Sequence, residues 1–465
     1  MKGLLIAGDR SGSGKTSITL ALSALLAASR AVQTFKVGMD YIDPSYLTGV
    51  TERPCRNLDG YVMSESEIRG IFSHGCRGAD IAIVEGVRGL FEGAEALTDL
   101  GSTAAVARQL NLPVVLVIDA RSITRSAAAI VRGFQVFDPD VAIRGVIINK
   151  ISGERHREKT IRAIEHYCGV PVIGAIPRME EMGLAARHLG LVPYREGAQG
   201  EEFRGRIDLI KRVIGEHVDL DALLRISGEF EPPAEESPLH AMPDAPDLEI
   251  GVALDEAFNF YYADLFDVLA SLGARAIPFS PLRDRLPEAD GYILGGGCPE
   301  LFGPELEANA AAREGIREVS RSGTPIYAEC GGLIYLTDRM VLTPGSADLE
   351  EERTYELAGV FAGEARMPAR RKLGYVVGTS DAASPMGRAA FRGHEFHYSS
   401  VRLSPTTRYA YRLTRGSGIM DGLDGAFIDR TIGSYTHLHP VTSREMLAHF
   451  VACCRSPGGM KRKAY

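Results

Sequence analysis

A glycine-rich segment near the N-terminus carries the residues of a phosphate-binding loop. Residues 8–16 read G-D-R-S-G-S-G-K-T, between an apolar run and a helical stretch at 17–28. Backbone N–H groups of such a turn converge on phosphate oxygens, while Lys15 can bridge the outer phosphates and Thr16 can ligate Mg²⁺. Gly8 lies one residue further out than in the usual G-x4-G-K-[ST] spacing, which indicates a longer loop variant. The predicted nucleotide site comprises Gly12, Ser13, Gly14, Lys15, Thr16 and Ser17.

Charged residues at the ends of predicted strands extend this site. Glu85 closes I-A-I-V-E, where it could hold Mg²⁺ or position water, or remain a solvated acid at a strand exit. Asp119 closes L-V-I-D and has the same two interpretations. Lys36 ends another strand and is followed by Asp40 and Asp43. This set suits a second anion that meets the γ-phosphate, with Asp43 on the metal, but a plain turn fits equally well.

A cysteine in the second half has the surroundings of a nucleophile. Residues 325–332 read P-I-Y-A-E-C-G-G, an apolar strand that runs into Cys330 and two glycines. Such an elbow exposes a thiol at the carboxyl end of a strand, and backbone N–H groups there can hold an oxyanion. The other six cysteines are interpreted as buried apolar residues.

An attacking thiol needs a base, and the segment 433–440, G-S-Y-T-H-L-H-P, offers His437 and its rival His439. No acid follows at the two-residue spacing of complete triads, so we expect a Cys–His dyad. A second glycine-rich turn at 290–300, D-G-Y-I-L-G-G-G-C-P-E, suits the remaining oxyanion donor. Cys298, inside that turn, has no strand-to-helix elbow before it and is not the predicted nucleophile.

Short Val, Ile and Leu runs that alternate with amphipathic stretches must position these residues. Continuous apolar strands between helices predict parallel sheets that are covered on both faces. Asn149 and Lys150, after one such run, are similar to a pair that several nucleotide-binding folds place against the base. The predicted strands are 3–7, 31–37, 80–84, 113–118, 143–148 and 170–176, then 249–254, 290–294 and 325–328.

The chain has 465 residues, 45% of them hydrophobic, which is globular and too long for one small module. Its net charge of −8 argues against a general binder of nucleic acid or membrane surfaces. Seven cysteines without a CxxC pair fit a reduced, cytoplasmic setting better than disulfides or zinc. The N-terminal apolar run flows into the glycine-rich loop, so we interpret it as a strand and not as a signal peptide.

One segment divides the chain. Residues 228–247 contain five prolines and six acidic residues, with no Lys or Arg, which is typical of a linker. We therefore expect two α/β domains, at 1–228 and 248–458, with the linker at 229–247 and a basic tail at 459–465.

Taken together, the ordered motifs resemble the cobyrinate a,c-diamide synthases, glutamine-dependent amidases that also include nickel-sirohydrochlorin a,c-diamide synthase of methanogens. The resemblance covers nearly the whole chain. The blocks that carry it are S-G-S-G-K-T, K-V-G-x-D-Y-I-D-P, V-E-G-V-x-G-L-x-x-G, G-S-T-A-A-V-A and R-H-L-G-L-V-P, then D-E-A-F-N-F-Y-Y, Y-A-E-C-G-G-L, R-G-H-E-F-H-Y-S and S-Y-T-H-L-H.

The resemblance implies a P-loop synthetase domain with a parallel sheet like that of dethiobiotin synthetase, followed by a class I glutamine amidotransferase α/β domain. It implies that Cys330 attacks glutamine with His437 as its base. It also implies that ATP phosphorylates a tetrapyrrole carboxylate with Mg²⁺ present, that ammonia displaces the phosphate, and that a homodimer can form. The residues it assigns are Thr16, Asp43 and Glu85 for Mg²⁺, and Lys36, Tyr41, Asp43 and Glu92 for substrate and acyl phosphate.

Several positions depart from the family pattern and leave the exact tetrapyrrole open. Met39, Leu47 and Arg88 are expected near the crevice for the macrocycle, where Arg88 could pair with a peripheral carboxylate. Phe91 and Glu92 replace a Tyr-Asp pair. A rival within the class is cobyric acid synthase. A rival from another class is a MinD-like nucleotide switch, but Asp9 and Arg10 stand where that switch carries an extra Lys.

Overall fold

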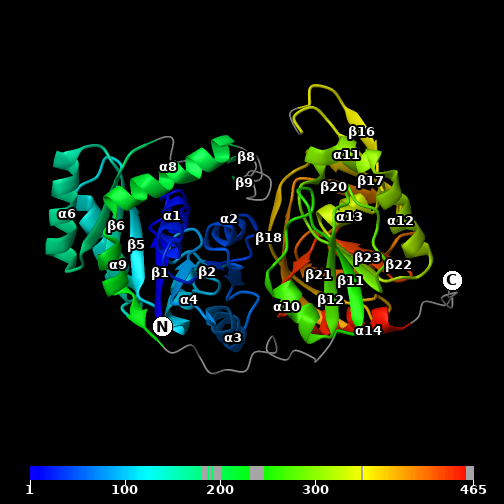
Figure 1. Ribbon diagram of the computed structural model, residues 1–465, viewed down its shortest axis with the longest axis horizontal. Helices are drawn as coiled ribbons and strands as arrows, with labels where there is room; N and C mark the ends of the chain where they lie inside the picture. The colour runs from blue at the N-terminus through cyan, green and yellow to red at the C-terminus, as the bar shows by residue number, and fades with distance from the viewer. Residues whose placement is uncertain (180–185, 188–189, 192–200, 231–245, 347–348, 457–465) are drawn as a thin grey trace. The chain divides into compact units, whose positions relative to one another are not determined.

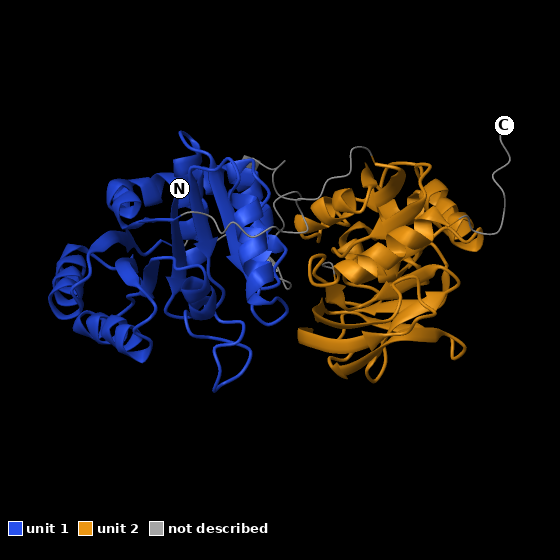
Figure 2. Ribbon diagram, turned by 90° about the horizontal axis from the view of Figure 1, so that it is seen from below, with its two compact units in different colours: residues 1–237 blue, residues 238–465 orange. Residues whose placement is uncertain are grey.

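The computed structural model describes residues 1–179, 186–187, 190–191, 201–230, 246–346 and 349–456. The chain forms two compact units, 1–237 and 238–465 (Figure 2). Most of the expected linker, residues 231–245, and the whole expected tail at 459–465 lie outside the described residues. None of the described helices combines the length and the apolarity that a membrane crossing requires.

The first unit is built on a parallel sheet with the strand order β3-β2-β4-β1-β5-β6-β7, and β10 pairs antiparallel with the start of β1. Strands β2, β1, β5 and β6 of this sheet are labelled in Figure 1. The six apolar runs predicted in this half are all strands, and their side chains are buried almost throughout, because helices cover the sheet. The strands are β1 (Lys2–Gly8), β2 (Val32–Val37), β3 (Arg56–Leu58), β4 (Ile81–Glu85), β5 (Val114–Asp119), β6 (Ile143–Ile151), β7 (Val172–Pro177) and β10 (Gly228–Glu229).

The helices of this unit share its apolar core. Ile18 and Leu22 of α1 (Lys15–Ala27) belong to the same buried cluster as Ile210 and Ile214 of α8 (Glu201–His217). The helix α3 begins at a capping box in which Ser64 and Glu67 satisfy each other's backbone N–H groups. The remaining elements are α2 (Ile42–Thr51), α3 (Glu65–Cys76), α4 (Thr103–Gln109), α5 (Arg125–Phe137), α6 (Glu154–Cys168) and α9 (Leu220–Ile226), with the short pair β8 (Ala186–Arg187) and β9 (Gly190–Leu191).

The second unit has a large sheet with the order β12-β11-β13-β14-β23-β22-β21-β18-β19-β24. Its first five strands are parallel neighbours, and the others pair antiparallel. These strands are β11 (Leu248–Ala253), β12 (Ala274–Phe279), β13 (Gly291–Leu294), β14 (Ile326–Glu329), β18 (Lys372–Ser380), β19 (Ala389–His397), β21 (Arg408–Arg415), β22 (Leu423–Ile428), β23 (Thr431–Ser434) and β24 (His437–Leu438).

The three strands predicted in this unit, at 249–254, 290–294 and 325–328, are present as β11, β13 and β14, and the strand–helix alternation stops after α13 (Gly331–Tyr335). A second sheet, β16-β15-β17-β20, and the antiparallel half of the large sheet follow. Antiparallel strands can leave one face in water, and β18 indeed mixes exposed and buried positions, so it lacks the continuous apolar run that marks a parallel strand. The other elements are β15 (Thr337–Leu342), β16 (Arg353–Glu356), β17 (Phe361–Met367), β20 (Ser400–Leu403), α10 (Asp264–Ser271), η3 (Pro299–Phe302), α11 (Gly303–Ala308), α12 (Ala310–Arg321) and α14 (Arg444–Arg455).

Candidate functional site

The glycine-rich loop joins β1 to α1, and two of its glycines have backbone angles that side chains disfavour. Gly12 has φ 77° and Gly14, the N-cap of α1, has φ 94°. A Cβ on Gly14 would lie 2.2 Å from Asn149 Nδ2. The first turn of α1 carries no acidic residue, so its N–H groups remain suited to an anion. Lys15 is buried, and burial, followed by the charge of Lys36, lowers its pKa.

Residues at the ends of β5 and β6 brace this loop. Asn149 Nδ2 donates to Ser13 O at 2.9 Å, and Lys150 Nζ donates to Gly12 O at 2.6 Å. Lys150 also donates to Asp119 Oδ2 at 2.9 Å. Burial favours a raised pKa for Asp119, but hydrogen bonds from Arg121 and Lys150 outweigh it and lower the pKa to about 2. Asn149 and Lys150 therefore bind carbonyl groups of the loop in this structure. The sequence had indicated only a similarity to pairs that contact the nucleotide base, and it did not suggest this role.

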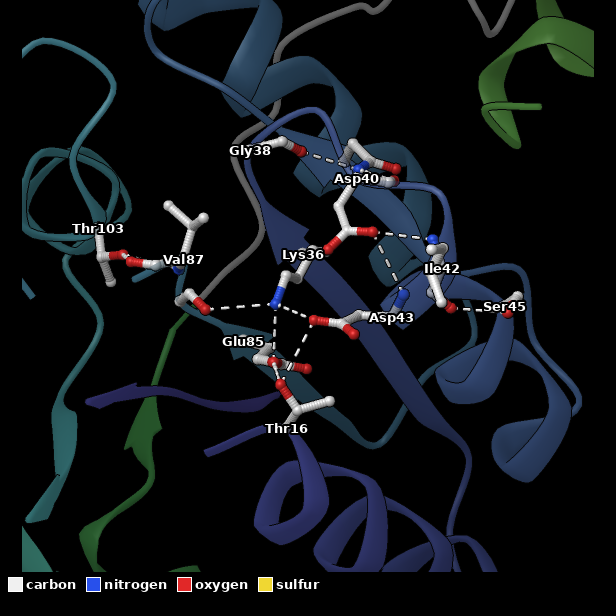
Figure 3. Close-up of polar contacts among 12 residues, drawn as sticks. Thr16, Lys36, Gly38, Asp40, Ile42, Asp43, Ser45, Glu85, Val87 and Thr103 are labelled. Carbon is white, nitrogen blue, oxygen red and sulfur yellow. Dashed lines mark hydrogen bonds and ion pairs between the residues drawn. The ribbon is translucent and has the colours of Figure 1, made fainter. Parts of the chain in front are cut away.

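Four residues form what we call the carboxylate cage: Thr16, Lys36, Asp43 and Glu85 (Figure 3). Lys36 Nζ lies 2.6 Å from Asp43 Oδ2 and 2.7 Å from Glu85 Oε1. Thr16 Oγ1 donates to Glu85 Oε1 at 2.7 Å. Lys36 and Glu85 are register partners in the parallel pair β2 and β4, so both side chains reach the same end of the sheet. The structure thus brings together residues from three separate motifs of the sequence.

Charge compensation explains how these groups are buried. Burial disfavours the Lys36 ammonium, but Asp43 and Glu85 outweigh it and raise its pKa. Burial likewise favours neutral Asp43, but Lys36 keeps the pKa of Asp43 low. Burial raises the pKa of Glu85, and burial together with Asp43 raises the pKa of Asp40 to about 7. Asp43 and Glu85 both contact Lys36, but only for Asp43 does the ammonium outweigh the effect of burial, whereas for Glu85 burial is the larger effect.

The oxygen atoms of the cage are suitable ligands for Mg²⁺. Thr16, Asp43 and Glu85 offer only oxygen atoms, which Mg²⁺ prefers, and Glu85 Oε2 is buried without a hydrogen-bond partner among the described residues. No group of three or more His, Cys, Asp or Glu ligands occurs in the part of the chain that the structure describes. Mg²⁺ commonly binds through one or two carboxylates plus phosphate and water, so two acids and a hydroxyl match a nucleotide-bound ion.

The other residues assigned to the substrate lie around the cage or away from it. Tyr41 is buried at the N-cap of α2, next to the cage residue Asp43. Glu92 is exposed and packs beside Gly89, which adjoins the glycine-rich loop, so Glu92 lies at the rim and not in the cage. Arg88 is also exposed, with φ 51°. Leu47, which was expected near the crevice, is a buried core residue with 1% exposure.

Cys330 occupies a strained elbow between β14 and α13. Its φ of 46° and ψ of −98° are unfavourable for a residue with a side chain, and such strain is concentrated at functional sites. A Cβ on Gly332 would lie 2.1 Å from Leu294 O, and one on Gly331 would lie 3.0 Å from Gly297 N. Both glycines therefore permit the close approach of α13 to the turn after β13, as the motif predicted.

The turn at 295–297 adjoins the elbow. Gly332 N donates to Gly295 O at 3.0 Å, and Gly295 N donates to Tyr261 Oη at 2.7 Å. The first N–H groups of a helix have no partner inside the helix, so Gly331 at the start of α13 offers a donor beside the thiol. Gly297 N lies next to it and supplies a second candidate donor for an oxyanion.

Of the two histidines, the structure brings His437 to the thiol. Burial alone would lower the pKa of His437, but hydrogen bonds with Cys330 and Glu329 outweigh it and raise the pKa to about 10. His437 Nδ1 lies 3.3 Å from Glu329 Oε2. His439 instead lies with Nε2 3.5 Å from Asp264 Oδ2. The expectation that His437 has no acid partner is therefore wrong, because the acid precedes Cys330 and does not follow the histidine.

The fold and these two sites indicate a class of protein in which a P-loop nucleotide-binding unit is joined to a glutamine amidotransferase unit. Residues 4–192 match the CobQ/CobB/MinD/ParA nucleotide binding domain, and residues 249–444 match the CobB/CobQ-like glutamine amidotransferase domain. A cobyrinate a,c-diamide synthase of Methanosarcina barkeri is 47% identical over 97% of this chain and 96% of its own length. The enzymes of that name from Methanosarcina acetivorans and Listeria monocytogenes are 49% and 40% identical, over 96% and 97% of this chain and 94% and 98% of their own lengths.

The chain belongs to the cobyrinate a,c-diamide synthase family. It is an amidating ligase with a glutamine amidotransferase domain, as the sequence predicted. The predicted fold class, a P-loop domain followed by an α/β amidotransferase domain, is also confirmed. A MinD-like switch would account for the first unit alone and is not needed.

Proposed function

We propose that this enzyme amidates the a and c acetate side chains of a modified tetrapyrrole, either cobyrinate or nickel-sirohydrochlorin, with ATP and glutamine as co-substrates. The observation that carries the proposal is the pairing of the carboxylate cage beside a glycine-rich loop with a Cys–His site in a glutamine amidotransferase domain. The names of the relatives supply the tetrapyrrole. The seven free cysteines suit a cytoplasmic enzyme.

In the first unit, a substrate carboxylate oxygen attacks the γ-phosphorus of ATP and ADP leaves, which gives an acyl phosphate. The loop N–H groups and Lys15 hold the phosphates, and Lys36 lies where it can hold the anionic oxygens as they change partners. Thr16, Asp43 and Glu85 would hold Mg²⁺, which supplies charge neutralisation when bound. Ammonia then attacks the acyl carbon, and inorganic phosphate leaves.

In the second unit, the Cys330 sulfur attacks the side-chain amide carbon of glutamine, while His437 accepts the thiol proton and returns a proton to the departing ammonia. Gly331 and Gly297 N–H groups hold the oxyanion. Water then hydrolyses the thioester and releases glutamate. The ammonia must stay unprotonated until it meets the acyl phosphate, because ammonium is not a nucleophile.

The test is incubation of the purified protein with ATP, Mg²⁺, glutamine and each tetrapyrrole in turn, followed by mass spectrometry. Two successive conversions of carboxylate to amide, absent without ATP, are the expected result. The substrate that is converted with the higher kcat/KM is the preferred one. Failure of both tetrapyrroles to change, or amidation of side chains beyond two, would contradict the proposal; the second outcome would favour a cobyric acid synthase.

A further inference from the structure

Glu329 has a set of contacts that links it to the base of the thiol site. Its Oε2 lies 3.3 Å from His437 Nδ1, and its Oε1 accepts a hydrogen bond from Leu438 N at 2.9 Å. The Tyr327 hydroxyl also donates to Oε1. The side chain of Glu329 is only 11% exposed, so these contacts replace most of its water. One carboxylate oxygen is thus held by two donors, and the other is left to the imidazole.

The strand order explains why an acid from this position reaches the base. Glu329 is the last residue of β14, and its register partner in β23 is Ser434. The chain continues from β23 to β24, where His437 lies. Because Nδ1 of His437 contacts Glu329, Nε2 is the nitrogen that remains for Cys330. A single strand end therefore delivers the acid and the nucleophile to opposite nitrogens of one imidazole.

We propose that Glu329 is a positioning residue for glutamine hydrolysis, which holds the His437 proton on Nδ1 and stabilises the imidazolium that forms when Cys330 loses its proton. The inference rests on the proposed roles of Cys330 and His437. An acid hydrogen-bonded to the far nitrogen of a catalytic histidine fixes its tautomer and orientation, and loss of that charge costs orders of magnitude in rate on unrelated folds.

The other groups around His437 make the charge of Glu329 matter. His394, from β19, stacks on His437 with ring centroids 5.0 Å apart, and burial, followed by the nearby histidines, lowers its pKa well below the usual range. Burial raises the pKa values of Tyr327 and Tyr261. These three neighbours therefore favour their neutral forms at pH 7, and the carboxyl group of Glu329 is the acidic group that contacts Nδ1 of His437.

The position two residues after the histidine, where complete triads carry an acid, holds another residue in this chain. Two residues after His437 stands His439, which is fully buried with its Nε2 3.5 Å from Asp264. That carboxylate lies beside a histidine other than the proposed base. The acid that contacts Nδ1 of His437 is therefore Glu329 of β14, and it does not come from the chain after the histidine.

The experiment compares three variants of the full chain by glutamate release, without tetrapyrrole. Glu329→Gln keeps the size and an acceptor oxygen but removes the charge, and we expect kcat for glutamine hydrolysis to fall about 100-fold or more with little change in KM. Glu329→Asp keeps the charge on a shorter arm and should recover part of the rate. Tyr327→Phe removes only the hydroxyl that donates to Glu329, and it should lose less than about tenfold.

A second readout separates a charge effect from loss of structure. Iodoacetamide alkylates thiolates, so the rate at which it modifies Cys330 reports the thiolate population at each pH. In the wild type we expect fast alkylation that changes little between pH 6 and 8, because the imidazolium stabilises the thiolate. In Glu329→Gln the rate should be low at pH 6 and rise with pH.

Three results would overturn the inference: glutamine hydrolysis by Glu329→Gln within threefold of the wild type, equal losses in Glu329→Gln and Tyr327→Phe, or an unchanged alkylation profile. Cys330→Ala tells this failure apart from failure of the proposed function. If Cys330→Ala still hydrolyses glutamine, the proposed function itself is wrong. If it does not, while Glu329→Gln does, only the role of Glu329 is wrong.

Discussion

The carboxylate cage and the thiol site both bury charge, but they do so in different ways. In the cage, Lys36 lies within 2.7 Å of two carboxylates, so opposite charges are already compensated before any ligand arrives. In the thiol site, His437 lies between Cys330 and Glu329, and the proposed reaction moves one proton from the thiol to the imidazole. In the cage, the charges are balanced at all times, and we call this a standing balance. In the thiol site, the reaction itself changes which groups are charged.

The two sites also differ in the conformation of their backbone. The cage draws on α1, β2, α2 and β4, whose strand ends meet at one edge of a parallel sheet without a strained residue among its four members. The thiol site relies on the left-handed φ of Cys330 and on glycines that admit close contact. A site that binds polyanions needs converging charges, whereas a site that makes a covalent bond needs one atom at a defined place.

The most direct test that the two sites have separate roles is to remove one residue from each of them. Lys15→Ala should reduce amidation with glutamine and with ammonia by about 1000-fold or more, because both need the phosphorylated carboxylate. Cys330→Ala should abolish glutamine use but keep amidation with free ammonia. The measurement is product formation with each nitrogen source, and retained glutamine use by Cys330→Ala would refute the division of labour.

Removing the cation from the cage tests the standing balance. Lys36→Met leaves Asp43 and Glu85 as neighbouring buried acids, so we expect a loss of about 3–5 kcal/mol in the stability of the first unit. Added Mg²⁺ should raise the melting temperature of this variant more than that of the wild type, since the ion can replace the missing charge. Calorimetry measures both, with the exposed Lys159→Met as control. Equal effects in the two variants would contradict the balance.

The thiol site should show its charge in a pH dependence. The pKa of His437 is about 10 in the folded protein, above its ordinary value near 6.5. Its contribution to stability is therefore complete below pH 6.5 and is lost as the pH rises to about 10. Over this range the melting temperature of the wild type should fall more than that of His437→Gln. His449→Gln, on α14, serves as control, and parallel curves for the wild type and His437→Gln would exclude the effect.

The smallest expected effect concerns the brace of the glycine-rich loop. Asn149→Ala removes the hydrogen bond to Ser13 O, which is worth about 1 kcal/mol, so KM for ATP should rise about fivefold. Glutamine hydrolysis without ATP should not change, because the thiol site lies in the other unit. Steady-state kinetics with varied ATP checks this, and an unchanged KM would show that the loop holds its form without the brace.

Local motifs allowed the sequence to predict much of both sites. The glycine-rich loop and the elbow at Cys330 are contiguous, so their geometry follows from neighbouring residues. The parallel strands were predictable because burial on both faces produces continuous apolar runs. The side chains of the cage could be nominated one by one, since each ends a strand or begins a helix.

What the sequence missed depends on pairing between distant segments. The contact of Glu329 with His437 follows from β23 beside β14 and from β24 beside β19, and neither pairing leaves a local pattern. The contacts of Asn149 and Lys150 with loop carbonyls likewise join residues far apart in the chain.

The parallel pairing of β14 with β23 also affects how the enzyme acquires its reactivity. Everything from α13 to β22 lies between these two neighbours, so their union closes one of the longest loops in the second unit. Closing such a loop is entropically costly and slow compared with local hairpins. We therefore expect Cys330 to meet His437, its proposed base, only after the intervening strands have formed, so that a growing or half-folded chain would carry an ordinary, unreactive cysteine. The reactivity of Cys330 therefore depends on complete folding of the second unit.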